Sequence, residues 1–272
     1  MGYLTTEKKK VTVKTFVEMK RDGNKLAMLT AYDYTTARLI DEAGVDSILV
    51  GDSASNVMLG NDSTLPITLD EMIVYARGVA RGCQRALVVC DMPFGSYQVS
   101  PEEGVRNAVR LIRETGVDAV KLEGGEEVAP TIERIVNAGI PVVGHLGLTP
   151  QSIHKLGGYG VRARSEVEAT KLIADAQALE KAGCFAVVLE KIPASVAQQV
   201  TDLLSVPTIG IGAGSHCDGQ VLVYADAMGL TQGFEPKFLR EFAAMGEELR
   251  RGVRAYCEAV KCDEFPNESE SY

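Results

Sequence analysis

Short apolar segments recur along the chain, and each one follows a glycine-containing turn. Clear examples lie within 42–51, 114–123, 137–145 and 181–190. Their apolar residues run together instead of alternating with polar ones, as in parallel strands that are covered on both faces. The glycine before each run suits the left-handed residue that often ends a helix. The pattern therefore predicts buried parallel strands, each preceded by a helix.

Helical periodicity fills the segments between these runs. We expect strands at 26–30, 45–50, 86–90, 118–122, 141–145, 185–189 and 207–211, and an eighth at 221–224 or 226–230. We expect helices at 33–43, 68–82, 101–115, 126–138, 165–182, 194–204 and 235–258. Capping residues support several helix starts, such as Thr68 with Glu71 three residues later. Strands that alternate with helices in this way favour an α/β fold of the (β/α)₈ (TIM) barrel type, with a doubly wound open sheet as the alternative.

The chain length fits a single domain. The 272 residues suit one barrel better than two domains, because α/β barrels of about 250 residues fold as one unit. Within a domain spanning 1–272, we expect the barrel at about 24–260, an N-terminal extension at 1–23 and a polar, extended tail at 263–272. The glycine-rich connection at 145–161 is too long for a routine turn, and long loops in compact domains are commonly functional.

Charge and composition narrow the partners and the compartment. Lys and Arg total 28 and Asp and Glu total 37, so the net charge of −9 argues against nucleic acid or an anionic membrane as a partner. No apolar run approaches the roughly 18 residues of a membrane span. Segment 1–23 lacks the apolar core of a signal peptide. The six cysteines form no CxxC pair, which indicates reduced thiols and a cytoplasmic protein.

Ionisable residues stand at the ends of five consecutive predicted strands, from the second to the sixth. They are Asp52, Asp91, Lys121 with Glu123, His145 and Glu190. In a parallel barrel these strand ends meet at one mouth, where the active site lies. Any single residue of this kind is as readily a helix cap or a solvated loop charge. The convergence of five strands favours a catalytic site.

Three of these residues form an oxygen-rich set. Asp52, Asp91 and Glu123 carry carboxylates without a nearby His or Cys cluster, so the set suits Mg²⁺ rather than Zn²⁺. A small α-keto acid could chelate such a metal, which would stabilise the enolate formed when the substrate loses a proton. Lys121 and Ser53 are candidates for binding the substrate carboxylate. Lys121 has a structural alternative, an ion pair with Asp91 or Glu123.

Glu190 is the first candidate for the base that removes this proton. It ends the apolar run 185–189, and a carboxylate in apolar surroundings is suited to accept a proton near neutral pH. Its structural alternative is an ion pair with Lys191. His145 is a second candidate base, although a lone histidine at a strand end is more often a hydrogen-bonding residue. The glycine-rich segment 210–214 resembles a phosphate loop, or it permits close backbone approach at the barrel mouth.

Seven short blocks resemble the ketopantoate hydroxymethyltransferase family in order and spacing. They read TAYD, VGDS, DSTLP, DMPF, VKLEGG, GHLGLTPQS and GIGAG, at 30–33, 50–53, 62–66, 91–94, 120–125, 144–152 and 210–214. The resemblance extends over about 11–266. It implies transfer of a hydroxymethyl group from 5,10-methylenetetrahydrofolate to 3-methyl-2-oxobutanoate, by Mg²⁺-assisted enolisation and aldol-type addition. The implied product is 2-dehydropantoate, in pantothenate and coenzyme A biosynthesis.

The resemblance also implies a role for each site residue. The metal site of the family, with one Mg²⁺ per subunit, corresponds to Asp52, Asp91 and Glu123. The keto-acid site corresponds to Asp52, Ser53, Asp91 and Lys121, and the proton acceptor corresponds to Glu190. Family members form homo-oligomers, typically decamers. The implied partners are therefore a small keto acid, folate and further copies of the chain.

The chain departs from the family pattern at two places. Gly160, Arg162 and Ala163 replace the Lys, Gln and Gly of the family's loop, which puts the contacts of that loop in question. Ser269 stands in the tail where a Glu-His pair is more usual, so an oligomer contact made by the tail is expected to differ. Neither change touches the proposed metal or base residues.

Two other functions compete with this one. The first is a Mg²⁺-dependent lyase or mutase of the phosphoenolpyruvate-mutase kind, which carries a Lys-Lys-Cys-like motif on a mobile loop. This chain has no such motif. The second is an inactive barrel that binds keto acid or folate for regulation. Such a protein is expected to have lost a metal ligand or the base, and all of these residues are present.

Overall fold

The structure is a computed structural model and describes residues 9–272. The chain divides into two compact units, Met1–Leu222 and Val223–Tyr272. The expected single domain over 1–272 therefore stays a prediction. The first eight residues of the expected N-terminal extension lie outside the described residues.

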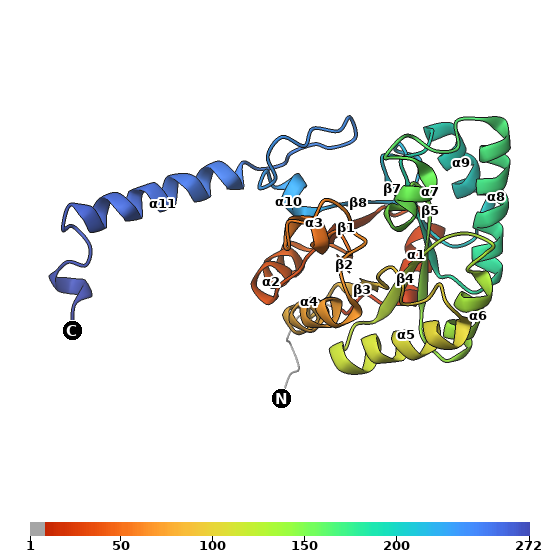
Figure 1. The fold of residues 1–272 in the computed structure, drawn as a ribbon, viewed down its shortest axis with the longest axis horizontal. Helices are drawn as coiled ribbons and strands as arrows, with labels where there is room; N and C mark the ends of the chain where they lie inside the picture. Colours follow the sequence, from red (N-terminus) through yellow and green to blue (C-terminus); the bar gives the residue numbers. More distant parts are fainter. Residues whose placement is uncertain (1–8) are drawn as a thin grey trace. The chain divides into compact units, whose positions relative to one another are not determined.

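Eight parallel strands of the first unit form a closed barrel (Figure 1). The eighth strand pairs with the first as well as with the seventh, so the sheet has no open edge. The strands are β1 (Leu26–Thr30), β2 (Ser47–Val50), β3 (Leu87–Asp91), β4 (Ala119–Glu123), β5 (Val142–Gly147), β6 (Ala186–Glu190), β7 (Thr208–Ile211) and β8 (Gly219–Leu222). Closure confirms the predicted (β/α)₈ barrel and excludes the open sheet.

Six helices of this unit match the predicted ones to within three residues at each end. They are α2 (Tyr34–Ala43), α4 (Leu69–Gly82), α5 (Pro101–Thr115), α6 (Ala129–Asn137), α8 (Glu166–Lys181) and α9 (Ala194–Leu203). Four further helices were not predicted, and they are α1 (Val13–Arg21), α3 (Ala54–Val57), η1 (Pro150–Ser152) and α7 (Ile153–Leu156). Three of these four are a single turn or less, which is too short to display a helical period.

Capping groups explain why the longer helices begin where they do. The Thr68 side chain accepts the backbone N–H of Glu71 at 3.2 Å, and the Glu71 carboxylate accepts the backbone N–H of Thr68 at 2.8 Å. This reciprocal pair fixes the first turn of α4. A glycine ends another helix, α5. Gly116 takes the left-handed conformation there, with φ of 81°, which glycine adopts without strain.

Alternate strand residues fill the barrel interior. Leu87, Val89 and Ala119 belong to one buried apolar cluster with inward-facing residues of the other strands. Phe16 of α1 joins this cluster and meets Phe185 edge-on, with ring centroids 5.7 Å apart. Since Phe185 directly precedes β6, α1 closes the end of the barrel where the strands begin.

Three aspartates stand directly before β2, β4 and β8 at this same end, and they are Asp46, Asp118 and Asp218. Each accepts a backbone N–H from the neighbouring strand, at 3.0, 2.8 and 2.9 Å respectively. Each also forms an ion pair, with Arg85, Lys10 and Lys20 respectively. The hydrogen bonds join adjacent strands, and the ion pairs add flanking segments to them, at the end of the barrel that serves stability rather than catalysis.

The eighth strand lies slightly earlier than predicted. It spans Gly219–Leu222, so the expected range 221–224 overlaps it and the alternative 226–230 is wrong. The strand begins with a glycine and a polar residue, and only its pairing with β1 and β7 reveals it as a strand. The hydrophobic pattern alone therefore placed it too late.

The second unit is helical and contains α10 (Tyr224–Ala227), α11 (Met245–Lys261) and η2 (Glu268–Glu270). The predicted helix at 235–258 was wrong at its start, because α11 begins ten residues later. The backbone N–H groups of Phe242 and Met245 bond to carbonyls of Ala227 and Met228, at 2.7 and 2.9 Å, instead of to the preceding turn of a helix. Tertiary contacts thus override the helical pattern before residue 245.

The tail is more ordered than the extended arm that was expected. Asn267 accepts the backbone N–H of Ser269 at 2.9 Å and so begins the short helix η2. None of the helices in residues 9–272 combines the length and the apolar character needed to cross a membrane.

Candidate active site

The strands carry ionisable side chains at the mouth of the barrel where they end. Residues two apart on a strand face the same side, so inward-facing positions continue from the apolar cluster towards this mouth. Along β3 to β6, Val89 is followed by Asp91, Ala119 by Lys121 and Glu123, Val143 by His145, and Val188 by Glu190. The interior is therefore apolar at depth and charged at the mouth.

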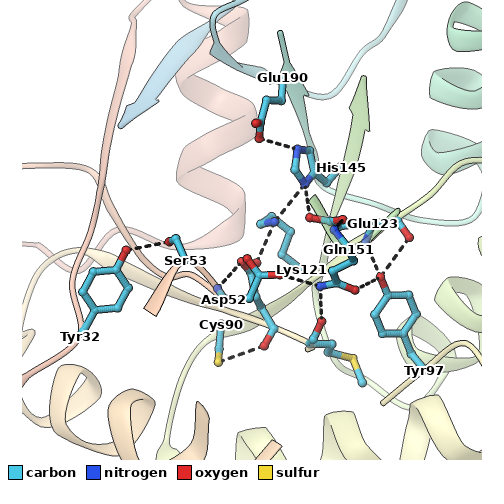
Figure 2. A network of polar contacts seen from close by, with 12 residues as sticks. Tyr32, Asp52, Ser53, Cys90, Tyr97, Lys121, Glu123, His145, Gln151 and Glu190 are labelled. Atoms are coloured by element: carbon cyan, nitrogen blue, oxygen red, sulfur yellow. Dashed lines mark hydrogen bonds and ion pairs between the residues drawn. The ribbon is translucent and has the colours of Figure 1, made fainter. Parts of the chain in front are cut away.

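Strand register determines which of these side chains become neighbours. Asp91 lies opposite Lys121 in the β3–β4 pair, and the Asp91 Oδ1 to Lys121 Nζ distance is 2.9 Å. Glu123 lies opposite His145 in the β4–β5 pair, and Glu123 Oε1 is 3.1 Å from His145 Nδ1. Glu190 of β6 extends the series, with Oε2 3.2 Å from His145 Nε2 (Figure 2).

Asp52 joins the cluster through the turn that follows β2. Its backbone N–H donates to Asp91 Oδ2 at 2.9 Å. The preceding position is closely packed, because a Cβ on Gly51 would lie 2.7 Å from Ser53 Oγ and would force that side chain to move. The structure thus brings together all six ionisable residues that the strand ends predicted.

Burial separates one carboxylate from the others. Asp52, Asp91, Lys121, Glu123 and His145 each expose 5% or less of their surface. The side chain of Glu190 is 18% exposed. Glu190 is therefore the carboxylate of this cluster that a molecule entering the mouth reaches most readily.

The cluster carries more negative than positive charge, and this shows in Asp52. Burial, followed by the charges of Asp91 and Glu123, raises the pKa of Asp52 well above its usual range. Burial acts to lower the pKa of Lys121, but the charges of Asp91, Glu123 and Asp52 outweigh it and the net shift is upward. Lys121 therefore stays charged, and the carboxylates of the cluster still outnumber its positively charged side chains.

The carboxylates around His145 favour its protonated form. Burial and the charge of Lys121 act to lower its pKa, but Glu123 and Glu190 outweigh them and raise the pKa to about 9. Burial acts to raise the pKa of Glu123, and His145 and Lys121 outweigh it and lower that pKa. His145 Nδ1 then donates to Glu123, and Lys121 Nζ, 3.2 Å from the same nitrogen, is a like-charged neighbour rather than a donor.

Ser53 lies beside the cluster but is bonded elsewhere. Its Oγ is 2.7 Å from the hydroxyl oxygen of the buried Tyr32, and the two form a hydrogen bond (Figure 2). The structural alternative for Glu190 was an ion pair with Lys191. Lys191 Nζ instead donates to the Tyr159 carbonyl at 2.5 Å, and Glu190 contacts His145. Lys191 has a φ of 51°, a strained backbone position directly after the candidate base.

The donor chemistry of the cluster fits a divalent cation. Asp91 Oδ1 is a buried oxygen with an ion-pair contact but no hydrogen bond, and burial, followed by the charges of Asp91 and Glu123, raises the pKa of Asp52. Glu123 is already engaged at both oxygens, by His145 at Oε1 and by the backbone N–H of Gln151 at Oε2. Across residues 9–272, no three or more His, Cys, Asp or Glu side chains stand arranged to hold a metal ion, so the three-ligand set stays a prediction.

Two buried residues of the site escaped the sequence analysis. Gln151 of η1 contacts the carboxylates of Asp52 and Glu123, and Tyr97, on the segment after β3, contacts Gln151 and the backbone of Glu123 (Figure 2). Neither carries a charge at neutral pH, so a search for titratable residues at strand ends passes over them. Two signals in the sequence pointed towards Gln151, the length of the connection after β5 and the block GHLGLTPQS at 144–152, which contains it.

The glycine-rich segment 210–214 serves close packing. A Cβ on Gly214 would lie 2.5 Å from Cβ of Ala194, and Gly214 has a φ of 83°. A Cβ on Gly210 would lie 3.0 Å from the sulfur of Cys217. These contacts favour the second of the two readings of this motif, close backbone approach at the barrel mouth.

A cavity of about 720 Å³ adjoins the cluster. It is lined by Gly124, which directly follows Glu123, by Gly147, which ends β5 two residues after His145, and by the connection between β5 and α8. Its wall carries three cations and four acidic residues, which are Lys155, Arg162 and Lys171 and Glu126, Glu127, Glu168 and Asp175. Its volume lies in the range of small-molecule sites, roughly 300–1,000 Å³.

Comparison with known proteins gives a match over nearly the whole chain. The sequence model of the family described as ketopantoate hydroxymethyltransferase matches residues 10–268. A protein of Flavobacterium johnsoniae named 3-methyl-2-oxobutanoate hydroxymethyltransferase is 58% identical, with 97% of each chain covered. A protein of the same name from Parabacteroides distasonis is 59% identical, over 98% of this chain and 97% of its own.

Solved structures with a similar fold are more distant in sequence. A phosphonopyruvate hydrolase in complex with oxalate and Mg²⁺ has a TM-score of 0.60 at 12% identity and covers 95% of this chain and 93% of its own. A 2,3-dimethylmalate lyase of the phosphoenolpyruvate mutase/isocitrate lyase superfamily has a TM-score of 0.58 at 18% identity, with coverage of 96% and 91%. At this level of identity, the likeness shows the barrel fold alone.

Proposed function

The chain belongs to the ketopantoate hydroxymethyltransferase family and is a transferase enzyme, and from this premise we propose that it transfers a hydroxymethyl group from 5,10-methylenetetrahydrofolate to 3-methyl-2-oxobutanoate. The product is 2-dehydropantoate, an intermediate of pantothenate and coenzyme A biosynthesis. The reaction forms a carbon–carbon bond between C3 of the keto acid and the one-carbon unit, which takes its hydroxyl oxygen from water. Tetrahydrofolate leaves, and the C3 proton is removed.

One observation carries the chemical part of this proposal. Glu190, the most exposed carboxylate of the cluster, lies at the mouth with its Oε2 3.2 Å from the His145 ring. A base for an enolisation must reach a substrate carbon while remaining held in one orientation. Glu190 meets both conditions, so we assign it as the group that accepts the C3 proton.

His145 supports Glu190 from inside the barrel. Its Nδ1 donates to Glu123, which fixes the ring, and its Nε2 faces Glu190. We assign the histidine a positioning role rather than that of the base, because it joins Glu123 on β4 to Glu190 on β6 and is itself almost fully buried.

Asp52 and Asp91, with Glu123, are the residues that would hold one Mg²⁺ per subunit. When bound, the cation supplies Lewis-acid stabilisation for negative charge on the keto oxygen. Lys121, held by Asp91 at 2.9 Å, supplies a fixed positive charge for the substrate carboxylate. Ser53 offers its hydroxyl to the same substrate from the β2 end, where Tyr32 holds it.

The adjoining cavity offers space for the larger co-substrate. It opens beside Gly124 and Gly147, next to the strand ends that carry the reacting cluster. Folate has a flat ring system and a tail with carboxylates, and the cavity offers glycine-lined walls and Lys155, while Arg162 and Lys171 are paired with Glu168 and Asp175. We therefore place the one-carbon donor there.

A homo-oligomer in the cytoplasm completes the proposal, with a decamer as the state that the family resemblance implies. The helix α11 carries large apolar residues that are more than 40% exposed at spacings of three and four residues: Met245, Leu249, Val253, Tyr256 and Val260. Such a stripe is the usual surface for packing against another helix. All six cysteines are free thiols, which suits a reducing compartment.

Product formation tests the proposal directly. The full-length protein, with Mg²⁺, both substrates and detection by mass spectrometry, is expected to form 2-dehydropantoate, and EDTA is expected to stop the reaction. Cleavage of phosphonopyruvate or 2,3-dimethylmalate in place of this transfer would support the rival lyase. Absence of any turnover, with keto acid still bound, would support the inactive barrel.

A further inference from the structure

We propose that Gln151 is a positioning residue that holds Asp52 and Glu123 in place for the metal ion and the keto acid. Through it, the connection between β5 and α8 becomes part of the metal site. The inference rests on the proposed function, because it concerns the carboxylates that are proposed to bind Mg²⁺. It adds to that function a residue that is neutral, touches no reacting atom and comes from the long loop.

The amide nitrogen of Gln151 holds Asp52. Gln151 Nε2 donates to Asp52 Oδ2 at 2.9 Å and to the backbone carbonyl of Met92 at 2.9 Å. Both N–H groups of the amide are therefore used. Asp52 is only 5% exposed, so water is a poor substitute for this donor, and the amide holds the carboxylate in the cluster.

The amide oxygen of Gln151 fixes the orientation of the whole group. Gln151 Oε1 lies 2.8 Å from the hydroxyl of Tyr97 and accepts from Gln98 Nε2 at 3.1 Å. A reversed amide would set its oxygen against the Asp52 carboxylate and the Met92 carbonyl, which are both acceptors. The four contacts therefore allow a single orientation, with the donor side facing Asp52.

The backbone of Gln151 holds the second carboxylate. Its N–H donates to Glu123 Oε2 at 2.9 Å. Tyr97 contacts the same residue from the other side, because its hydroxyl accepts the backbone N–H of Glu123 at 3.1 Å. One residue of η1 thus reaches Asp52 after β2 and Glu123 on β4, and its own side chain is 5% exposed.

The chemistry of the side chain matters to this role. Glutamate at position 151 would add a fourth buried carboxylate and lose the donor, and lysine would add a cation that competes with the metal. An amide donates to Asp52 without changing the charge of the cluster. Residues that orient metal ligands in this way typically change metal affinity about 10- to 100-fold when they are removed.

The test is metal binding by the full-length Gln151→Met variant, which keeps the size of the side chain and removes its hydrogen bonds. Mn²⁺ serves as the probe for the Mg²⁺ site, and electron paramagnetic resonance measures its Kd. The expected result is a Kd raised about 10- to 100-fold. At saturating Mg²⁺, kcat should return to within about threefold of wild type while the half-saturating Mg²⁺ concentration stays high. A residue that only stabilised the fold would show no such recovery.

Gln98→Met is the matched control. It removes an amide that contacts the same Gln151 oxygen, but Gln98 is exposed and touches no carboxylate of the cluster. Its Mn²⁺ Kd is expected to stay within about threefold of wild type, below the range for residues that orient metal ligands. An equal loss in both variants would contradict the specific role of Gln151.

The other outcomes separate this inference from the proposed function. If wild type and Gln151→Met bind Mn²⁺ equally well, the inference about Gln151 is overturned and the proposed function is not. A wild-type protein that binds no Mn²⁺ would overturn the proposed metal chemistry and the inference with it. If Gln151→Met does not fold, Tyr97→Phe replaces it, because this change removes the hydroxyl that orients the Gln151 amide. Weaker Mn²⁺ binding by Tyr97→Phe supports the inference, and unchanged binding overturns it.

Discussion

At the scale of single residues, the cluster depends most on Asp91. Its two oxygens serve different partners, since Oδ2 accepts the backbone N–H of Asp52 and Oδ1 pairs with Lys121. Both Asp91 and Lys121 are almost fully buried, so neither has water as a substitute partner. The residue therefore links the turn after β2 to the charge on β4.

Replacement of Asp91 by alanine is expected to affect both binding and stability. It removes a proposed metal ligand and leaves the buried Lys121 without its nearest carboxylate, which typically costs about 3–5 kcal/mol in the free energy of unfolding. Calorimetric titration with Mg²⁺ should show weaker binding, and urea unfolding should show the loss of stability. Asp91→Asn keeps the size of the side chain and is the control for packing. Unchanged Mg²⁺ affinity in Asp91→Ala would remove Asp91 from the ligand set.

A second residue gives a pH test away from the metal site. Burial raises the pKa of the Cys184 thiol to about 12. In the unfolded chain the thiol ionises near its ordinary pKa, about 8.5, so the unfolded state gains thiolate first as the pH rises. The free energy of unfolding should therefore be unaffected by this thiol below about pH 8. It should then decrease as the pH rises towards 12, by up to about 1.4 kcal/mol per pH unit.

Denaturant unfolding at pH 7, 9 and 10 measures this effect, with Cys184→Ala as the reference. Wild type should lose stability relative to this variant between pH 9 and 10 and keep a constant difference near pH 7. Parallel stability curves for the two proteins over the whole range would contradict the buried, protonated thiol.

At the scale of secondary-structure elements, the repeating strands and long helices were predictable from the sequence, whereas the short elements were not. The strands β1 to β7 are continuous apolar runs because helices cover one face and the barrel interior the other, and such runs are readable without a structure. β8 has only four residues and starts with glycine, so its pairing with neighbouring strands, rather than its hydrophobic pattern, identifies it as a strand. The start of α11 was misplaced because backbone bonds to α10 hold the segment before it.

The aspartates at the strand starts lead to a prediction at this scale. Asp218 accepts the backbone N–H of Thr208 and pairs with Lys20 at 2.9 Å, with both side chains 16% exposed. Asp218→Ala removes both contacts between β7, β8 and α1, and we expect a loss of about 1–3 kcal/mol in the free energy of unfolding. The kcat of the folded fraction should stay close to wild type, because this end of the barrel is remote from the mouth. A large fall in kcat without loss of stability would contradict this division between the two ends.

At the scale of the whole molecule, parallel closure explains how much of the site could be predicted. Since every strand ends at the same mouth, residues as far apart in sequence as Asp52 and Glu190 were expected to meet, and the structure brings them into one cluster. The contacts between them were not predictable, because they depend on register and rotamers. The role of Gln151 was not predicted for two further reasons. Its loop, which follows β5, reaches back to residues after β2 and on β4, and its amide carries no charge.

The apolar stripe of α11 gives a prediction about assembly. Leu249 is 62% exposed within this stripe, so Leu249→Asp places a charge where another subunit is proposed to pack. Sedimentation velocity should show wild type as a large homo-oligomer and the variant as smaller species. Arg251→Asp, on an exposed position of the same helix outside the stripe, is the control for added negative charge. An unchanged distribution for Leu249→Asp would exclude this stripe from the interface.

The most direct test of the proposed chemistry is the loss of the C3 proton signal of 3-methyl-2-oxobutanoate in D₂O, followed by proton NMR with Mg²⁺ and without folate. We expect exchange that requires the protein, stops with EDTA and falls about 10²- to 10⁴-fold in Glu190→Gln, which should still bind the keto acid. Exchange by Glu190→Gln at the wild-type rate would contradict Glu190 as the base. Failure of wild type to exchange this proton, even after 5,10-methylenetetrahydrofolate is added, would contradict the enolisation itself.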